Sequence, residues 1–309
     1  MMNEKHIMLG ATLYIPCTRN DLIEIAKGQK LSNIKSLVFC TEDSVATKDL
    51  NLALHNLKNA LLSIQKNKNY KFIRVRNLQI FEEILNYIKQ HNLQEKNCIN
   101  GFVFPKSNIQ NLQQYINSLK NSLGNSAENS FLFMPTLETK EVFNINKMQN
   151  LVEFLKNVAW KQQIISLRIG GNDLFSLLNL RRPRKKTIYQ TPLGNVIANL
   201  ATTFLPEGFK LSAPIFEYLD DLETLAQEIQ TDLNFGLVGK TAVNPFQVEF
   251  IEKFYGVHQE EINAANEILN PQNPGIFRYQ DSMCEPATHT QWAKNILKRC
   301  EFFGIKTQQ

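Results

Sequence analysis

The sequence predicts an α/β protein, a (β/α)₈ TIM barrel with a C-terminal helical extension. Two observations lead to this prediction. Eight short apolar segments alternate along the chain with amphipathic stretches of helical period, and after the eighth segment the pattern is helical. With 309 residues, of which 43% are hydrophobic and 20% charged, the chain is long enough to form one such barrel around an ample core.

The eight apolar segments are expected to be parallel strands. Most of them are continuous apolar runs, which are typical of strands covered on both faces. In chain order they are Ala11–Cys17, Ser36–Asp43, Tyr70–Asn77, Gly101–Lys106, Phe131–Glu138, Ile164–Asp173, Lys210–Glu217 and Phe235–Pro245. An open, doubly wound sheet is the alternative, but the first strand is not followed by the GxGxxG that such a sheet often carries.

Helices are expected between the strands and beyond the last strand. Leucine and alanine recur at helical spacing in Asp49–Gln65, Asn111–Leu123 and Asp220–Thr231. Beyond Pro245 the expected helices are Phe246–Tyr255, Gln259–Leu269 and Ala287–Phe303, with a loop at Asn270–Gly275. We therefore expect a barrel domain over residues 1–250 and a helical extension over residues 251–309, packed on the barrel or on a neighbouring subunit.

Composition narrows the class of protein. No apolar run reaches the roughly 18 residues that span a bilayer, and residues 1–6 lack the apolar core of a secretory signal. The five cysteines (Cys17, Cys40, Cys98, Cys284 and Cys300) have no CxxC spacing, so neither a disulfide framework nor a zinc site is expected. The simplest prediction is a cytoplasmic protein that does not act at a membrane. The net charge of +5 is modest, and nucleic acid is not expected as a partner.

Ionisable residues gather where the predicted strands end, which is where active sites of such barrels lie. They are Arg19, Glu42, Asp43, Arg74, Arg76, Lys106, Glu138, Asp173, Glu217 and Lys240. Glu138 and Asp173 end neighbouring strands, so they are placed to share one hard divalent cation, Mg²⁺ or alternatively Mn²⁺. The alternative is a pair of solvated loop carboxylates.

Six segments carry a family resemblance: Thr41–Val45, Ile73–Asn77, Phe104–Lys106, Pro135–Glu138, Gly170–Leu174, and Gly239–Pro245 with Gln247. In this order they resemble the citrate lyase β-subunit and hydroxyketoacid aldolase superfamily (HpcH/HpaI type), including its TIM-barrel C–C bond lyase variants. The resemblance implies a magnesium-dependent enzyme that makes or breaks a carbon–carbon bond beside a carbonyl. Its expected substrate is a 2-keto acid or a related acyl thioester, and the reaction passes through an enolate.

The resemblance also implies roles for individual residues. Glu138 and Asp173 match the metal ligands, and Arg74 matches the arginine that faces the carbonyl and the developing enolate oxygen. A guanidinium suits this role because it stays charged and offers a planar fork of donors. We expect Asp43 to act beside Arg74 in catalysis.

The resemblance further implies that a carboxylate near the start of the last helix acts as general acid or base, in its own or in a neighbouring subunit. Glu285 is the first candidate, and His289 is the second because its pKa lies near working pH. An ordinary helix N-terminus explains the same residues.

The remaining charged candidates are expected to bind the substrate or to orient groups that do. They are Arg19, Glu42, Arg76, Lys106, Lys240, Arg181 and Arg182. The last two belong to the basic segment 181–186, which suits an anionic handle such as phosphate, pyrophosphate or coenzyme A, with a solvated loop as the alternative.

Two departures from the citrate lyase pattern leave the substrate open. Ser107-Asn108 follows Lys106 where that family has a glutamate nearby, and Asn244-Pro245 replaces its His-Pro. Whether the enzyme uses a coenzyme A thioester therefore stays open. Two alternatives remain: a phosphoenolpyruvate or pyruvate-type transferase, and a barrel that binds a nucleotide or phosphorylated metabolite without catalysis. The expected partners are a small carboxylate or phosphorylated substrate and further copies of the chain, because a helical extension suits a homo-oligomer.

Overall fold

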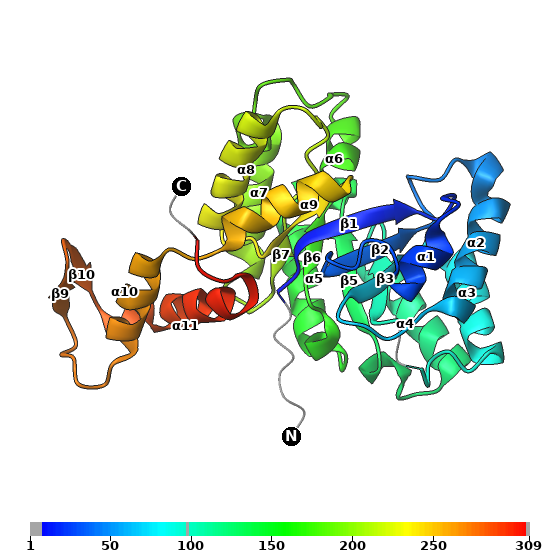
Figure 1. Ribbon diagram of the computed structural model, residues 1–309, viewed down its shortest axis with the longest axis horizontal. Coiled ribbons are helices and arrows are strands. Elements are labelled where there is room, and N and C mark those ends of the chain that lie inside the picture. The colour runs from blue at the N-terminus through cyan, green and yellow to red at the C-terminus, as the bar shows by residue number, and fades with distance from the viewer. Residues whose placement is uncertain (1–7, 97–98, 307–309) are drawn as a thin grey trace. The chain divides into compact units, whose positions relative to one another are not determined.

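A single sheet of eight parallel strands forms the centre of the computed structural model, which describes residues 8–96 and 99–306 (Figure 1). The strands are β1 (Gly10–Pro16), β2 (Ser36–Cys40), β3 (Tyr70–Arg74), β4 (Gly101–Phe104), β5 (Leu132–Leu137), β6 (Leu167–Ile169), β7 (Leu211–Ser212) and β8 (Gly239–Ala242). Each strand pairs with its neighbour in sequence, and β1 also pairs with β8. The Ala213 N–H donates to the Gly239 carbonyl at 2.7 Å and brings β7 against β8, which confirms the predicted barrel.

Helices connect consecutive strands. They are α1 (Leu22–Lys27), α2 (Leu50–Ser63), α3 (Leu78–Gln90), α4 (Ile109–Leu123), α5 (Ile145–Asn157), α6 (Gly171–Leu177), α7 (Pro192–Phe204) and α8 (Leu222–Asn234). Several begin at a polar residue that follows a strand: the side chains of Asn77, Asn108 and Asp221 each accept a hydrogen bond from a backbone N–H in the first turn. These caps stabilise the first turns of α3, α4 and α8.

Seven of the eight strands, all but β1, are shorter than the sequence predicted, and the difference is largest for β6, β7 and β8. β6 ends at Ile169 because Gly170 and Gly171 begin the next helix, so Asp173 lies in the first turn of α6. β7 has only two residues. β8 begins at Gly239 because α8 ends in a turn at Gly236, whose φ of 74° favours glycine.

Apolar side chains fill both sides of the strands. Residues that face inward form one cluster of Leu9, Val38, Phe72, Val103, Met134 and Ile165. Outward residues pack on the helices; for example, Phe81 of α3 meets the rings of Phe102 and Phe104 edge-on. Packed side chains therefore fill the barrel below its carboxyl end.

The chain divides into two units, residues 1–248 and 249–309. The second unit holds most of α9 (Pro245–Tyr255) together with α10 (Gln259–Leu269) and α11 (Pro286–Phe303). Its own core is Val257, Ala265, Ile268, Cys284, Ala293 and Ile296. The expectation of helices alone beyond Pro245 is wrong, because β9 (Phe277–Tyr279) and β10 (Ser282–Cys284) form a short antiparallel hairpin.

The structure bears on two features that the composition singled out, membrane-spanning helices and cysteines. Within residues 8–96 and 99–306, no helix combines the length and apolar character needed to cross a membrane. Cys17, Cys40, Cys284 and Cys300 are free thiols. Cys98 and the N-terminal residues 1–6 lie outside the described part of the chain.

Candidate active site

Six of the predicted site residues come together at the carboxyl ends of consecutive strands. Glu42 and Asp43 follow β2, Arg74 is the last residue of β3, Lys106 follows β4, Glu138 follows β5, and Asp173 lies in α6 after β6. In a parallel barrel these strand ends share one rim. We call these six residues the rim cluster.

Arg74 forms ion pairs with three of the four carboxylates of the rim cluster. One of its terminal nitrogens lies 2.7 Å from Glu42 Oε2, 3.0 Å from Asp43 Oδ2 and 3.2 Å from Glu138 Oε1. Burial lowers the pKa of Arg74, but the carboxylates around it, Glu138 foremost, raise the pKa above its ordinary value. Its Nε is buried without a hydrogen-bond partner among the described residues. Arg74 is therefore a fixed positive charge with a donor left over.

Glu138 is the most buried carboxylate of the cluster, with a side chain 2% exposed. It accepts a hydrogen bond of 2.8 Å from the Lys106 backbone N–H. Gly170 makes room for it, since a Cβ there would lie 2.3 Å from Glu138 Oε2. Burial raises the pKa of Glu138 to about 7, and the nearby negative charge of Asp173 adds to the rise.

Lys106 spans the carboxylates. Its Nζ lies 2.7 Å from Glu42 Oε1 and 3.7 Å from Asp43 Oδ1 and from Asp173 Oδ1. Its backbone is left-handed, with a φ of 48°, and this turn presents the N–H to Glu138 while the side chain crosses the rim. Burial lowers the pKa of Lys106, but Glu42 and the other carboxylates raise it above its ordinary value.

The donor set suits a hard divalent cation. The rim cluster has four carboxylates against two cations, Arg74 and Lys106, so two negative charges remain. Among the described residues no His, Cys, Asp or Glu forms a group of three metal ligands. That Glu138 and Asp173 hold Mg²⁺ as a pair stays a prediction. A site of two carboxylates leaves coordination positions for water and for a chelating substrate.

Two predicted substrate-binding arginines lie apart from the rim cluster. Arg76 donates to the Val45 carbonyl at 3.0 Å and to Thr47 Oγ1 at 3.3 Å, so it holds the loop between β2 and α2. Arg19 makes two hydrogen bonds of 2.8 Å to Asp21 in the loop after β1. In the structure both arginines make hydrogen bonds to residues of nearby loops and not to the rim cluster.

Lys240 and Arg182 belong to a buried ionic network. Lys240 Nζ lies 2.9 Å from Glu228 Oε1 and 2.9 Å from Asp232 Oδ2, and Arg182 lies 2.5 Å from Glu228 Oε2. All four side chains are fully buried. The expectation that Lys240 ends its strand and meets the substrate is therefore wrong: it is the second residue of β8, on the face that packs on α8. Arg182 likewise has no exposed side chain to offer a substrate.

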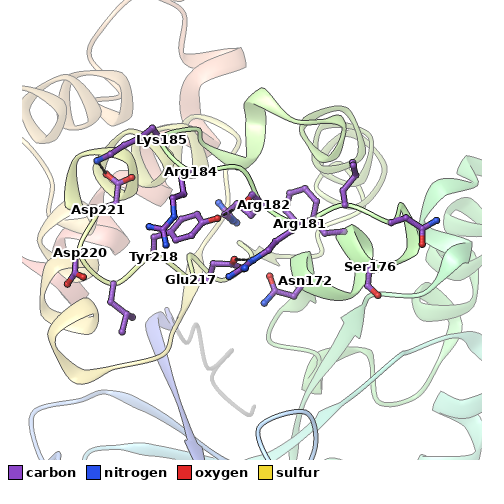
Figure 2. Close-up of a pocket in the computed structure, with 14 residues that line it drawn as sticks. Asn172, Ser176, Arg181, Arg182, Arg184, Lys185, Glu217, Tyr218, Asp220 and Asp221 are labelled. Carbon is purple, nitrogen blue, oxygen red and sulfur yellow. Dashed lines mark hydrogen bonds and ion pairs between the residues drawn. The ribbon is translucent and has the colours of Figure 1, made fainter.

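The basic segment 181–186 lines a cavity of about 990 Å³ between the loop after α6 and the loop before α8 (Figure 2). Arg181 pairs with Glu217 at 3.5 Å, Lys185 pairs with Asp221 at 3.2 Å, and the Arg184 guanidinium lies 4.7 Å from the centre of the Tyr218 ring. Asn172, next to Asp173, is also part of the lining. The cavity is thus roomy and polar, and carboxylates offset much of its positive charge.

Glu285 lies in the second unit. It is the residue before α11, where the Thr288 hydroxyl donates to its Oε2 at 3.3 Å. His289 accepts a hydrogen bond from the Glu285 backbone N–H at Nδ1, 3.2 Å away. A role for Glu285 as general acid or base stays a prediction.

The apolar pattern of the sixth strand concealed one buried cation. Arg168 stands in the middle of β6, is 2% exposed, and lies with its guanidinium 5.2 Å from the centre of the Tyr14 ring. Arg74 lies over the same ring at 5.7 Å. The signal was available, since an arginine inside the apolar run from Ile164 to Ile169 breaks the pattern of a buried strand.

The fold and the rim cluster define a TIM-barrel protein with an acidic, arginine-centred site at its strand ends. The chain belongs to the family of C–C bond lyases of the TIM-barrel fold, whose model matches residues 3–305. This confirms the resemblance found in the sequence. No curated protein sequence matches the chain.

Solved structures share the fold at low sequence identity. A citrate lyase of Burkholderia xenovorans LB400 aligns with a TM-score of 0.74 and 16% identity, over 98% of this chain and 95% of that one. CitE of Mycobacterium tuberculosis, in complex with magnesium, acetoacetate and coenzyme A, aligns with a TM-score of 0.68 and 14% identity, over 96% and 99%. The malate synthase of Haloferax volcanii, in a magnesium and glyoxylate complex, aligns with 0.63 and 14%, over 88% and 78%.

Proposed function

We propose that this protein is a metal-dependent carbon–carbon lyase of the aldol or Claisen type, acting on a 2-keto acid or a related acyl thioester. The observation that carries the proposal is the carboxylate pair Glu138 and Asp173 beside the buried cation Arg74. The similar structures of CitE and malate synthase contain magnesium with a keto acid or coenzyme A, which supports the same chemistry for this chain.

The rim cluster can perform this chemistry with each residue in a distinct task. Mg²⁺, when bound by Glu138 and Asp173, supplies positive charge to the oxygen on which negative charge develops. Arg74 adds a second positive charge from a fixed position, because Glu42 and Asp43 hold its guanidinium. The Lys106 N–H fixes Glu138.

The cavity beside Asn172 gives room for a substrate larger than a simple keto acid. At about 990 Å³ it could accommodate much of a coenzyme A handle. Arg184 and Tyr218 offer a cation and a ring for such a group. This observation also favours the second candidate, a barrel that binds a phosphorylated metabolite there without catalysis.

Calorimetric titration of Mg²⁺ tests the proposal. We expect Mg²⁺ to bind the wild-type protein, to bind more tightly when oxaloacetate, pyruvate or glyoxylate is present, and to lose this binding in Asp173→Asn. Removal of one of two charged ligands should weaken metal binding by roughly a hundredfold or more, because half of the protein's ligand set is lost.

The matched control is Asp281→Asn, the same change at an exposed turn of the second unit. It should leave the titration unchanged. If the wild-type protein binds no metal, the lyase proposal fails, and titration of inorganic pyrophosphate against Arg184→Met then tests the second candidate.

A further inference from the structure

Residues 106–111 connect β4 to α4 and include one of the two departures from the citrate lyase pattern, Ser107-Asn108. Lys106, the first of them, has a φ of 48°, in the left-handed region that a residue with a side chain rarely adopts. Such a backbone persists only where surrounding groups hold it, and positions of this kind often lie at functional sites. The contacts that hold Lys106 therefore bear on the task of this segment.

Two hydrogen bonds hold the peptide unit between Lys106 and Ser107 at both of its ends. The side-chain Nδ2 of Asn111 donates to the Lys106 carbonyl at 2.7 Å, and the Ser107 N–H donates to the Thr136 carbonyl at 2.9 Å. Ser107 is buried, and its hydroxyl donates to the Phe104 carbonyl at 2.9 Å. Lys106 cannot leave the left-handed region without turning this peptide unit, so these bonds oppose the change.

The turn directs two donors of Lys106 at carboxylates of the rim cluster. Its N–H donates to Glu138 Oε1 at 2.8 Å, and its Nζ lies 2.7 Å from Glu42 Oε1. The φ angle sets the direction of the N–H relative to Cβ, because φ is the rotation about the bond between N and Cα. A relaxed φ at Lys106 would therefore separate the two contacts.

Asn111 makes one contact that helix capping does not require. Its Oδ1 accepts from the Asn108 N–H at 2.9 Å, and Asn108 Oδ1 accepts from the Asn111 N–H at 2.9 Å, which makes a capping box at the start of α4. Glutamate or glutamine is usual at the position of Asn111 in such a box, and a carboxylate meets the acceptor role in full. An amide can in addition donate, and Asn111 donates to the Lys106 carbonyl.

We infer that Asn111 is a positioning residue of the rim cluster: its amide holds the Lys106 carbonyl and thereby directs the Lys106 N–H at Glu138. Asn111 acts through Lys106 on the orientation of that carboxylate. The inference deepens the proposed function, and its consequence for metal binding rests on that function, in which Glu138 is a ligand.

Asn111→Asp separates the two roles of the side chain, since a carboxylate keeps the cap and cannot donate to Lys106. The first measurement is the NMR signal of the residue 106 backbone amide in the metal-free protein, which a hydrogen bond to a carboxylate should shift downfield. Asn111→Asp should move this signal upfield. In calorimetric titration the variant should bind Mg²⁺ about tenfold more weakly. The added negative charge alone would strengthen binding of a cation, so charge cannot cause the loss.

Lys106→Gly provides the measurement that a purely structural role of Asn111 would not change. Glycine adopts a positive φ without support, so in this background Asn111→Asp should alter the Mg²⁺ affinity by no more than about twofold. If Asn111→Asp does not fold, Asn111→Glu takes its place, because glutamate is common at this position of a capping box.

The matched control is Gln190→Glu, the same exchange of an amide for a carboxylate at another capping box. There the side chain accepts from the Thr187 N–H at 2.9 Å. Gln190→Glu should change neither the residue 106 amide signal nor the Mg²⁺ affinity.

The outcomes separate this inference from the proposed function. If the wild-type protein binds no Mg²⁺, but Asn111→Asp shifts the residue 106 amide signal and does so less in the Lys106→Gly background, the lyase proposal fails and the positioning role stands. If Mg²⁺ binds and Asn111→Asp changes neither the signal nor the affinity, the positioning role is overturned and the proposed function stands. An equal loss of Mg²⁺ affinity in the wild-type and Lys106→Gly backgrounds also overturns the positioning role, because the loss then comes from the helix cap.

Discussion

Replacement of Lys240 with methionine should lower the free energy of unfolding by about 3–5 kcal/mol. The change leaves Asp232 with no cation and Glu228 with Arg182 alone, all fully buried. Burial raises the pKa of Glu228, but Lys240 and Arg182 outweigh it and hold the pKa below its ordinary value. Urea denaturation of the wild-type protein and the variant at pH 7 measures the loss.

The pH dependence of this variant gives a second measurement. Burial raises the pKa of Asp232 from 3.8 to about 6 even beside Lys240, and the pKa should rise further when that cation is gone. An acid whose pKa is raised by folding destabilises the folded state as pH increases from its unfolded value through its folded value. The penalty of Lys240→Met should therefore be small near pH 4 and grow up to and beyond pH 6.

Two further variants define the cause of the loss. Lys240→Met combined with Asp232→Asn removes one charge of each sign and should recover part of the stability, because the Arg182–Glu228 pair is kept. Lys58→Met removes the lysine of a partly exposed pair with Glu83 and should cost at most about 1 kcal/mol. A loss in Lys240→Met no larger than in Lys58→Met would show that the network contributes little.

The fold was predictable because apolar residues recur along the chain with the spacing of strands and of amphipathic helices. Each of the eight segments overlaps a strand of the barrel, since a strand covered on both faces needs a continuous apolar run. The strand ends were less predictable. β6 ends at Ile169 because α6 begins directly after it, and the close approach of Gly170 to Glu138 leaves no local pattern in the sequence. The hairpin of β9 and β10 was missed because three-residue strands carry too little pattern to recognise.

The site was predictable only where position along a strand decides it. Arg74 ends β3, Glu138 follows β5, and Asp173 lies in α6 just after β6, and the structure brings the three together. Lys240 was misassigned because in β8 the inward and outward residues, Thr241 and Lys240, are both polar. Arg168 was missed for the opposite reason: an apolar run suggested only core. Charge inside the barrel and charge beneath a helix are distinguished by register and packing, which the sequence does not display.

Gly170→Ala should weaken Mg²⁺ binding by roughly 10- to 100-fold, as expected when a group that positions a metal ligand is disturbed. The added Cβ would lie 2.3 Å from Glu138 Oε2 and 2.4 Å from Glu138 Cβ, so the carboxylate has to move. The backbone itself would accept alanine, because φ at Gly170 is −89°. Calorimetric titration of Mg²⁺ measures the change, and circular dichroism checks that the barrel is intact.

The matched control is Gly275→Ala, the same addition at a loop position with nothing within 4 Å. It should leave Mg²⁺ binding unchanged. The comparison isolates position from charge, because Gly170→Ala keeps every ionisable group of the rim cluster. If Gly170→Ala binds Mg²⁺ as the wild type does while Asp173→Asn does not, the metal is held by Asp173 without the observed placement of Glu138. If both variants lose the metal, Glu138 must occupy the position that Gly170 allows, and the two carboxylates act as a pair.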